Sequence, residues 1–124
     1  MMSKEERIHK LINNGEYQGV KFWIVKNGFR TEEMEYVWYC AYVQPPRNML
    51  RENITKFEAP GGISLNGYLD LCGKRRVWGW DYNHHTDVEF TNEGMINKFQ
   101  QMHEFEVIDI ISNDCREFIR RYFV

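Results

Sequence analysis

The sequence predicts an α+β fold: an antiparallel sheet of four to six strands, a C-terminal amphipathic helix packed on one face, and a short N-terminal helix. Residues 35–43 are rich in β-branched and aromatic side chains, which favours a strand. Residues 104–121 place apolar side chains at helical spacing. The chain has 124 residues, of which 43% are hydrophobic, so we expect residues 1–124 to form one domain with a substantial core.

The N-terminal segment, residues 3–14, is predicted to be the short helix. Ser3 and Glu6 have the spacing of a capping box, in which each side chain bonds the other residue's free backbone N–H. Gly15 is typical of the position just after a helix. The apolar stripe of this helix consists of Ile8, Leu11 and Ile12.

Strands are predicted on both sides of a turn at Asn27-Gly28. Residues 19–26 alternate as a strand with both faces partly buried. Asn27-Gly28 favours a type I′ turn, because both central positions of that turn need positive φ, and a strand then restarts near Phe29. Residues 35–43 end at Pro45-Pro46, since proline cannot donate to a strand ladder. One face of this strand carries Val37, Tyr39, Ala41 and Val43, and the other carries Tyr36, Trp38, Cys40 and Tyr42.

The middle of the chain has weaker patterns. Residues 44–60 show little periodicity, and we expect a long loop with one helical turn near residues 49–54. Residues 63–71 suit a strand broken at Asn66-Gly67, and residues 72–75 suit a turn.

The last third of the chain contains one more strand and the main helix. Residues 76–82 are expected to form a strand, and residues 88–90 to pair briefly. Residues 95–102 fit a helical stripe. Residues 104–121 carry acids at their start and arginines at their end, an order that suits the helix dipole.

Composition excludes several classes of protein. The net charge is -2 and the longest basic run, Lys74-Arg75-Arg76, is most simply a solvated hairpin tip, so we expect no binding of long nucleic acids. Cys40, Cys72 and Cys115 are odd in number and widely spaced, which favours reduced thiols over disulfides. No apolar run approaches the about 20 residues of a membrane span, and the N-terminus has no apolar signal segment. We therefore expect a cytoplasmic protein without a membrane partner.

The stretch from Ala59 to Asp87 holds the candidate site. Its imidazoles and carboxylates, Asp81, His84, His85 and Asp87, lie within seven residues and are of the types that bind zinc, manganese or iron. A bound metal would activate water for hydrolysis. The alternatives are a structural or exposed histidine pair, an Asp81 that caps the following turn, and an acid/base pair of Asp81 and Asp87. Adjacent histidines rarely reach one ion, so no metal and no cofactor is assigned.

The same stretch contains aromatic and glycine motifs. Trp78, Trp80 and Tyr82 share one strand face, which suits either core packing under the C-terminal helix or a stacking platform for a planar ligand. Gly61-Gly62 suits either a plain turn or backbone N–H groups that hold an anion. The predicted ligand-binding residues are Gly61, Gly62, Trp78, Trp80, Asp81, His84, His85 and Asp87.

Three segments together resemble a group of small phage and prophage proteins. They are Tyr39-Cys40-Ala41-Tyr42-Val43-Gln44-Pro45-Pro46, Gly61-Gly62-Ile63-Ser64, and Trp78-Gly79-Trp80-Asp81-Tyr82-Asn83-His84-His85-Thr86-Asp87. The resemblance covers the chain from about Val20 onward. Ala41 stands where the group has glycine, Ala59-Pro60 where a histidine precedes the glycine pair, and Asn83 where it has a second cysteine. The resemblance implies a mobile-element origin and a shared site, and it implies no reaction.

The sequence is compatible with three functions. The leading hypothesis is a non-catalytic accessory protein of a phage, of the counter-defence type, that binds a host protein or sequesters a small nucleotide-like ligand in the host cytoplasm. The second is a small metal-dependent hydrolase or phosphodiesterase that uses Asp81, His84, His85 and Asp87. The third is a purely structural interaction module. A homo-oligomer is compatible with all three.

Overall fold

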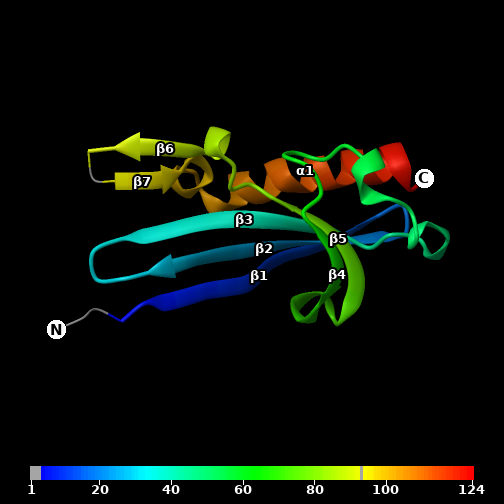
Figure 1. Cartoon of the computed structure of the whole chain (residues 1–124), viewed down its shortest axis with the longest axis horizontal. Coiled ribbons are helices and arrows are strands. Elements are labelled where there is room, and N and C mark those ends of the chain that lie inside the picture. Colours follow the sequence, from blue (N-terminus) through cyan, green and yellow to red (C-terminus); the bar gives the residue numbers. More distant parts are fainter. Residues whose placement is uncertain (1–3, 93) are drawn as a thin grey trace.

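The computed structural model describes residues 4–92 and 94–124 and confirms the α+β class. Its main sheet is antiparallel and five-stranded, in the order β1-β2-β3-β5-β4, and a separate two-stranded hairpin joins β6 to β7 (Figure 1). The helix α1 lies along one side of the main sheet, as predicted (Figure 1). The elements are β1 Glu6–Tyr17, β2 Val20–Arg30, β3 Glu35–Val43, β4 Leu65–Leu69, β5 Arg75–Asp81, β6 Val88–Thr91, β7 Gly94–Asn97 and α1 Glu104–Tyr122.

The predicted N-terminal helix is wrong, because residues 6–17 form strand β1. This strand pairs with β2 from Glu6 opposite Arg30 to Tyr17 opposite Val20. The pairing satisfies a long stretch of backbone, whereas an isolated helix of this length is marginal in water. A bulge between Leu11 and Asn13 shifts the alternation of the strand, and this irregularity gave the apolar residues their helical spacing. Ser3 of the expected capping box lies outside the described residues.

The predicted turn at Asn27-Gly28 is also wrong, because both residues lie inside β2 and pair with β1 and β3. The turn comes earlier, at Gln18 and Gly19, whose φ angles are 50° and 80°. Gly28 instead allows the backbone of β3 to come close to β2, since a Cβ on Gly28 would overlap with the carbonyl oxygen of Tyr36. The strand prediction for residues 35–43 is confirmed.

Four smaller predictions need correction. The loop after β3 contains two short 3₁₀ turns, at Arg47–Met49 and Ile54–Lys56, in place of one turn near residues 49–54. Asn66-Gly67 does not break its strand, because both residues pair with β5. Residues 95–102 are not one helix: they contribute to β7 and then to a 3₁₀ turn at Lys98–Gln101. Leu69 leads into a 3₁₀ turn at Asp70–Cys72, so β4 is shorter than predicted.

The face of the sheet under α1 forms the larger core. Trp78 and Trp80 of β5 are 0% and 1% exposed and pack beneath the helix, which agrees with the predicted alternation of residues 76–82. Burying side chains of this size contributes most of the stabilisation that folding gains from apolar burial. The helix residues in this core are Val107, Ile111, Cys115, Phe118 and Ile119.

The opposite face of the sheet has a smaller apolar cluster, which we call the second face. Its buried residues are Trp23, Val25, Cys40, Tyr42, Cys72 and Val77. In the part of the chain that the structure describes, no α-helix covers this face. It is covered by the curl of β4 and β5 and by the residues of the connecting turn, with Leu69 and Leu71 packed against the cluster (Figure 1). Across the described ranges, 4–92 and 94–124, no helix has the length and hydropathy to cross a bilayer.

Candidate functional site

The end of β5 and the loop at residues 59–62 bring together four of the predicted site residues, Gly61, Gly62, Asp81 and His84. Gly61 lies against the imidazole of His84, and a Cβ at Gly61 would overlap with that ring. The φ angles of Gly61 and Gly62 are 72° and 85°, a conformation that glycine adopts without steric cost. The N–H of Gly62 donates to the carbonyl of Ala59 over 2.9 Å. The pair therefore forms a turn that holds His84, and the Gly62 N–H is already used within it.

Asp81 caps the turn that follows β5. Its Oδ1 accepts a hydrogen bond from the backbone N–H of Asn83 over 3.1 Å, and its Oδ2 accepts one from the hydroxyl of Ser64 over 3.4 Å. His84 Nε2 lies 3.5 Å from Asp81 Oδ1. The carboxylate thus bonds the backbone after the strand end and the Ser64 segment, and it faces the imidazole without a hydrogen bond to Nε2. The bond to Asn83 is the capping role that the sequence left open as an alternative.

Asp87 has a separate structural role. Its side chain accepts a hydrogen bond from the backbone N–H of His84 over 3.0 Å, and Lys98 Nζ lies 3.2 Å from its Oδ1. Asp87 is buried, so the ammonium of Lys98 offsets the cost of removing its charge from water. His85 is exposed and lines a different hollow.

The histidines and aspartates are therefore dispersed over different contacts. Among residues 4–92 and 94–124, no three side chains of His, Cys, Asp or Glu are grouped closely enough to hold a metal ion. Asp81 and Asp87 each bond the loop backbone, so the geometry fixes this loop from two sides. The arrangement that the sequence suggested for hydrolysis is used here to shape residues 81–87.

Trp78 and Trp80 lie in the core and present no ring face to a ligand. The indole Nε1–H of Trp80 donates to the Tyr82 hydroxyl over 2.9 Å, and that hydroxyl donates to Asp114 Oδ2 of α1 over 2.7 Å. Burial, the largest cause, raises the pKa of Tyr82 far above its ordinary value, so the hydroxyl stays a neutral donor. The aromatic stripe anchors the helix to the sheet, in line with the core-packing alternative.

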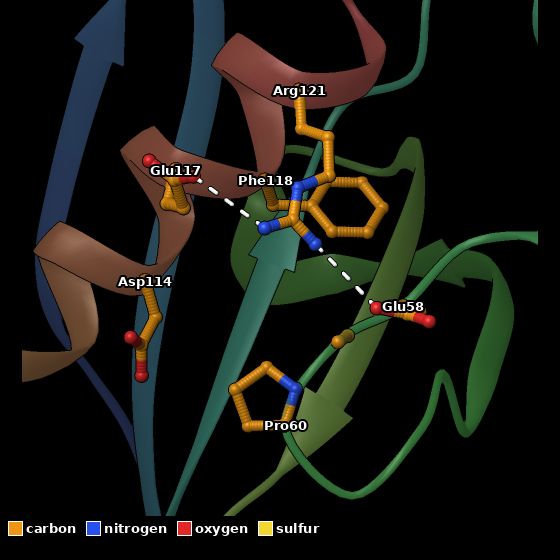
Figure 2. A pocket seen from close by; sticks show the side chains of 7 residues that line it. Glu58, Pro60, Asp114, Glu117, Phe118 and Arg121 are labelled. Carbon is orange, nitrogen blue, oxygen red and sulfur yellow. Dashed lines mark ion pairs between the residues drawn. The ribbon is translucent and has the colours of Figure 1, made fainter.

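A cleft of about 290 Å³ lies beside this anchor, between the 58–60 loop and α1 (Figure 2). Figure 2 shows the guanidinium of Arg121 between two carboxylates and next to Phe118. Arg121 lies 3.6 Å from Glu58 and 3.6 Å from Glu117. Sequence reasoning missed this cleft, although the spacing of Glu117 and Arg121 is that of a helical ion pair. The cation of this cleft, the guanidinium of Arg121, is thus already paired with two carboxylates of the same chain.

A second hollow, of about 350 Å³, lies at the β6–β7 hairpin. We call it the hairpin surface, and it is lined by Tyr36, Asn83, His85, Val88, Phe90 and Met95. Phe90 is 84% exposed and Met95 is 40% exposed. At its polar end the Tyr36 hydroxyl donates to Asn83 Oδ1 over 2.6 Å. Of these residues the sequence had indicated only His85, because the hollow joins the start of β3 to a distant hairpin.

The chain was compared with family models, curated proteins and solved structures, and none of them matches it.

Proposed function

We propose that this chain is a non-catalytic binding protein, encoded by a phage or related mobile element, that docks a host protein on the hairpin surface in the host cytoplasm. The observation that carries the proposal is the exposure of Phe90, 84%, beside a hollow lined largely by apolar side chains. Contiguous exposed apolar side chains commonly mark contact sites between proteins. The resemblance of residues 39–87 to small phage proteins supports the mobile-element origin.

The hairpin surface has the composition of a protein contact. Phe90 and Met95 supply an aromatic and a flexible apolar side chain, both of which are enriched at interfaces. Asn83 and His85 supply polar groups at the edge of the same hollow. Burying an exposed Phe side chain is worth about 1.5–3 kcal/mol. A partner with an apolar side chain for the hollow and a surface over Phe90 would gain both contributions.

The polar cluster at the end of β5 supports a binding role over a hydrolytic one. Asp81 bonds Asn83 and Ser64, and Asp87 bonds His84 and faces Lys98. These contacts hold the loop that carries Asn83 and His85 into the hairpin surface. The residues that looked catalytic in sequence would then act by positioning the contact surface.

The test is capture of a host protein by the purified chain, followed by reconstitution with that protein in pure form. We expect one stoichiometric partner, whose affinity falls at least about tenfold in Phe90→Ala and in Met95→Ala, as for interface anchors. Phe105→Ala is the matched control, because Phe105 is also exposed, at 67%, but lies on α1. Thermal unfolding of each variant checks that it is folded.

Two results would overturn this proposal. One is a reconstituted partner whose affinity is unchanged in Phe90→Ala and Met95→Ala. The other is a dimer of the chain in light scattering that Phe90→Ala converts to a monomer, which would assign the hairpin surface to self-association.

A further inference from the structure

A third hollow, of about 490 Å³, lies on the second face of the sheet, remote in sequence from the hairpin surface. We call it the second-face groove. It lies between the β1–β2 hairpin and the turn that leads into β5, and its lining includes Leu11, Glu16, Lys21, Trp23, Leu71 and Arg75. Its volume falls within the about 300–1,000 Å³ typical of small-molecule sites.

Two cations of the groove are not held by an ion pair among the residues that the structure describes. Lys21 of β2 and Arg75 of β5 both line the groove, and neither forms an ion pair or side-chain hydrogen bond with any residue in 4–92 or 94–124. The neighbouring Arg76 contrasts with them. Its guanidinium donates to Asn66 Oδ1 over 3.1 and 2.9 Å and lies 5.8 Å from the ring of Tyr68. Arg75 and Arg76 therefore face opposite sides of the sheet. Arg76 is hydrogen-bonded to another side chain, whereas Arg75 has no such bond among the described residues.

Apolar side chains form the rest of the wall. Trp23 lines the groove and is 6% exposed, and Leu11 is 37% exposed. Leu71 is half-buried on the opposite segment. Cys72 also lines the groove, and burial raises the pKa of its thiol to about 12, which keeps it neutral. The groove thus combines an apolar wall with two uncommitted cations.

We propose that the second-face groove binds a nucleoside monophosphate. Lys21 and Arg75 would hold the phosphate by charge-assisted hydrogen bonds, and the apolar wall of Leu11, Trp23 and Leu71 would take the planar base. Glu16, which faces Lys21 in the strand register and also lines the groove, leaves two cations against one carboxylate. That balance favours a single phosphate group over a triphosphate. Glu16 can also accept a hydrogen bond from a base amine. The site is separate from the hairpin surface and does not depend on the docking of a host protein.

Calorimetric titration of the full chain with AMP, GMP, CMP and UMP tests this assignment, with adenosine and inorganic phosphate as the two half-ligands. We expect at least one nucleotide to bind at least about tenfold more tightly than either half-ligand, because both parts of the groove are then filled. Lys21→Gln and Arg75→Gln should each weaken that binding at least about tenfold. Arg76→Gln, one residue away on the other face, should leave it unchanged. Glu16→Gln should tighten it.

Three results would overturn the assignment. They are no heat with any of the four nucleotides at millimolar concentration, equal losses in Arg75→Gln and Arg76→Gln, and phosphate that binds as tightly as the nucleotide, which would leave only an anion site. Phe90→Ala should bind the nucleotide like the parent protein, so failure of host-protein docking and failure of this site are read separately. Equal melting temperatures of the variants show that the losses are local.

Discussion

The two faces of the main sheet are both apolar but are covered in different ways. On one face α1 and the loop that follows β3 together bury Trp78 and Trp80 almost completely, with Phe57 of that loop against the Trp78 ring. On the other face short segments between β4 and β5 cover only part of the cluster, and a groove with two uncommitted cations remains beside Trp23. The difference shows that α1 and a long loop close over the tryptophans of one face, whereas the short connection between β4 and β5 leaves a groove on the other face where polar and apolar side chains meet.

The largest expected effect compares one tryptophan from each face. Trp80→Ala should lower the free energy of unfolding by about 3–5 kcal/mol, because Trp80 is 1% exposed and its removal leaves a large cavity. Trp38→Ala, on the half-buried margin of the second face, should cost about 1–2 kcal/mol. Urea unfolding followed by far-ultraviolet circular dichroism measures both. Equal costs would show that the second face is as tightly covered as the first.

The next effect compares the two glycines of the 59–62 turn. Gly61→Ala should cost about 2–3 kcal/mol, since it adds an overlap with His84 to the penalty of about 1–2 kcal/mol for a left-handed residue. Gly62→Ala should cost only that penalty, because a Cβ on Gly62 would have no atom within 4 Å. Urea unfolding of the two variants measures the difference.

A double-mutant cycle with His84→Ala isolates the overlap with the imidazole. In that background the cost of Gly61→Ala should fall to that of Gly62→Ala. A cost that stays the same in the His84→Ala background would mean that the Gly61 contact with the ring does not matter for stability.

A smaller effect concerns the link from the sheet to α1. Tyr82→Phe should lower the free energy of unfolding by about 1–3 kcal/mol, because it leaves the Trp80 Nε1–H and Asp114 Oδ2 without their partner. Tyr36→Phe is the matched control, since it removes a hydroxyl that makes one part-buried bond, to the exposed Asn83. If the two variants unfold at the same urea concentration, the two-bond link to α1 adds no more stability than that single bond.

The smallest effect compares a buried thiol from each face in alkali. Burial raises the pKa of Cys72 to about 12 and raises that of Cys115 well above its ordinary value. The folded state therefore holds these protons where the unfolded chain has lost them, so stability falls as the pH rises above about 8.5. Between pH 8 and pH 10 each thiol should account for about 1–2 kcal/mol of that loss.

Cys72→Ala and Cys115→Ala should each reduce this pH dependence, which urea unfolding at the two pH values measures. A smaller reduction for Cys72→Ala than for Cys115→Ala would show that water reaches Cys72 through the second-face groove. Equal reductions would show that the floor of the groove is as dry as the core under α1.

The sequence predicted a strand or helix correctly where the spacing of apolar residues matches the faces that the folded protein buries. Residues 35–43 form a strand as predicted because both faces of β3 are buried, and the helix predicted for residues 104–121 ends one residue later. The helix prediction at the N-terminus is wrong for residues 6–17, because an apolar spacing that fits one helical turn also arises from a bulged strand. The turn predicted at Gly28 is wrong, because glycine occurs where two backbones come close together as well as in turns.

The candidate site was predicted only in part. Asp81 was predicted as a ligand-binding residue, with a turn cap as one of the alternatives. The structure shows the cap, a role that sequence can indicate because it depends on a residue two positions away. The hairpin surface and the second-face groove were not found, since each joins segments far apart in the chain, as Tyr36 with Phe90 and Lys21 with Arg75.

The sequence by itself determined the α+β class, the central strand β3, the amphipathic helix and the alternation that sends Trp78 and Trp80 to one face, because these follow from the periods of strand and helix. The tertiary structure decided that β1 is a strand, that His84 and Asp81 hold a loop, and where the exposed hollows lie. These features depend on which distant residues become neighbours, and no local period encodes that choice.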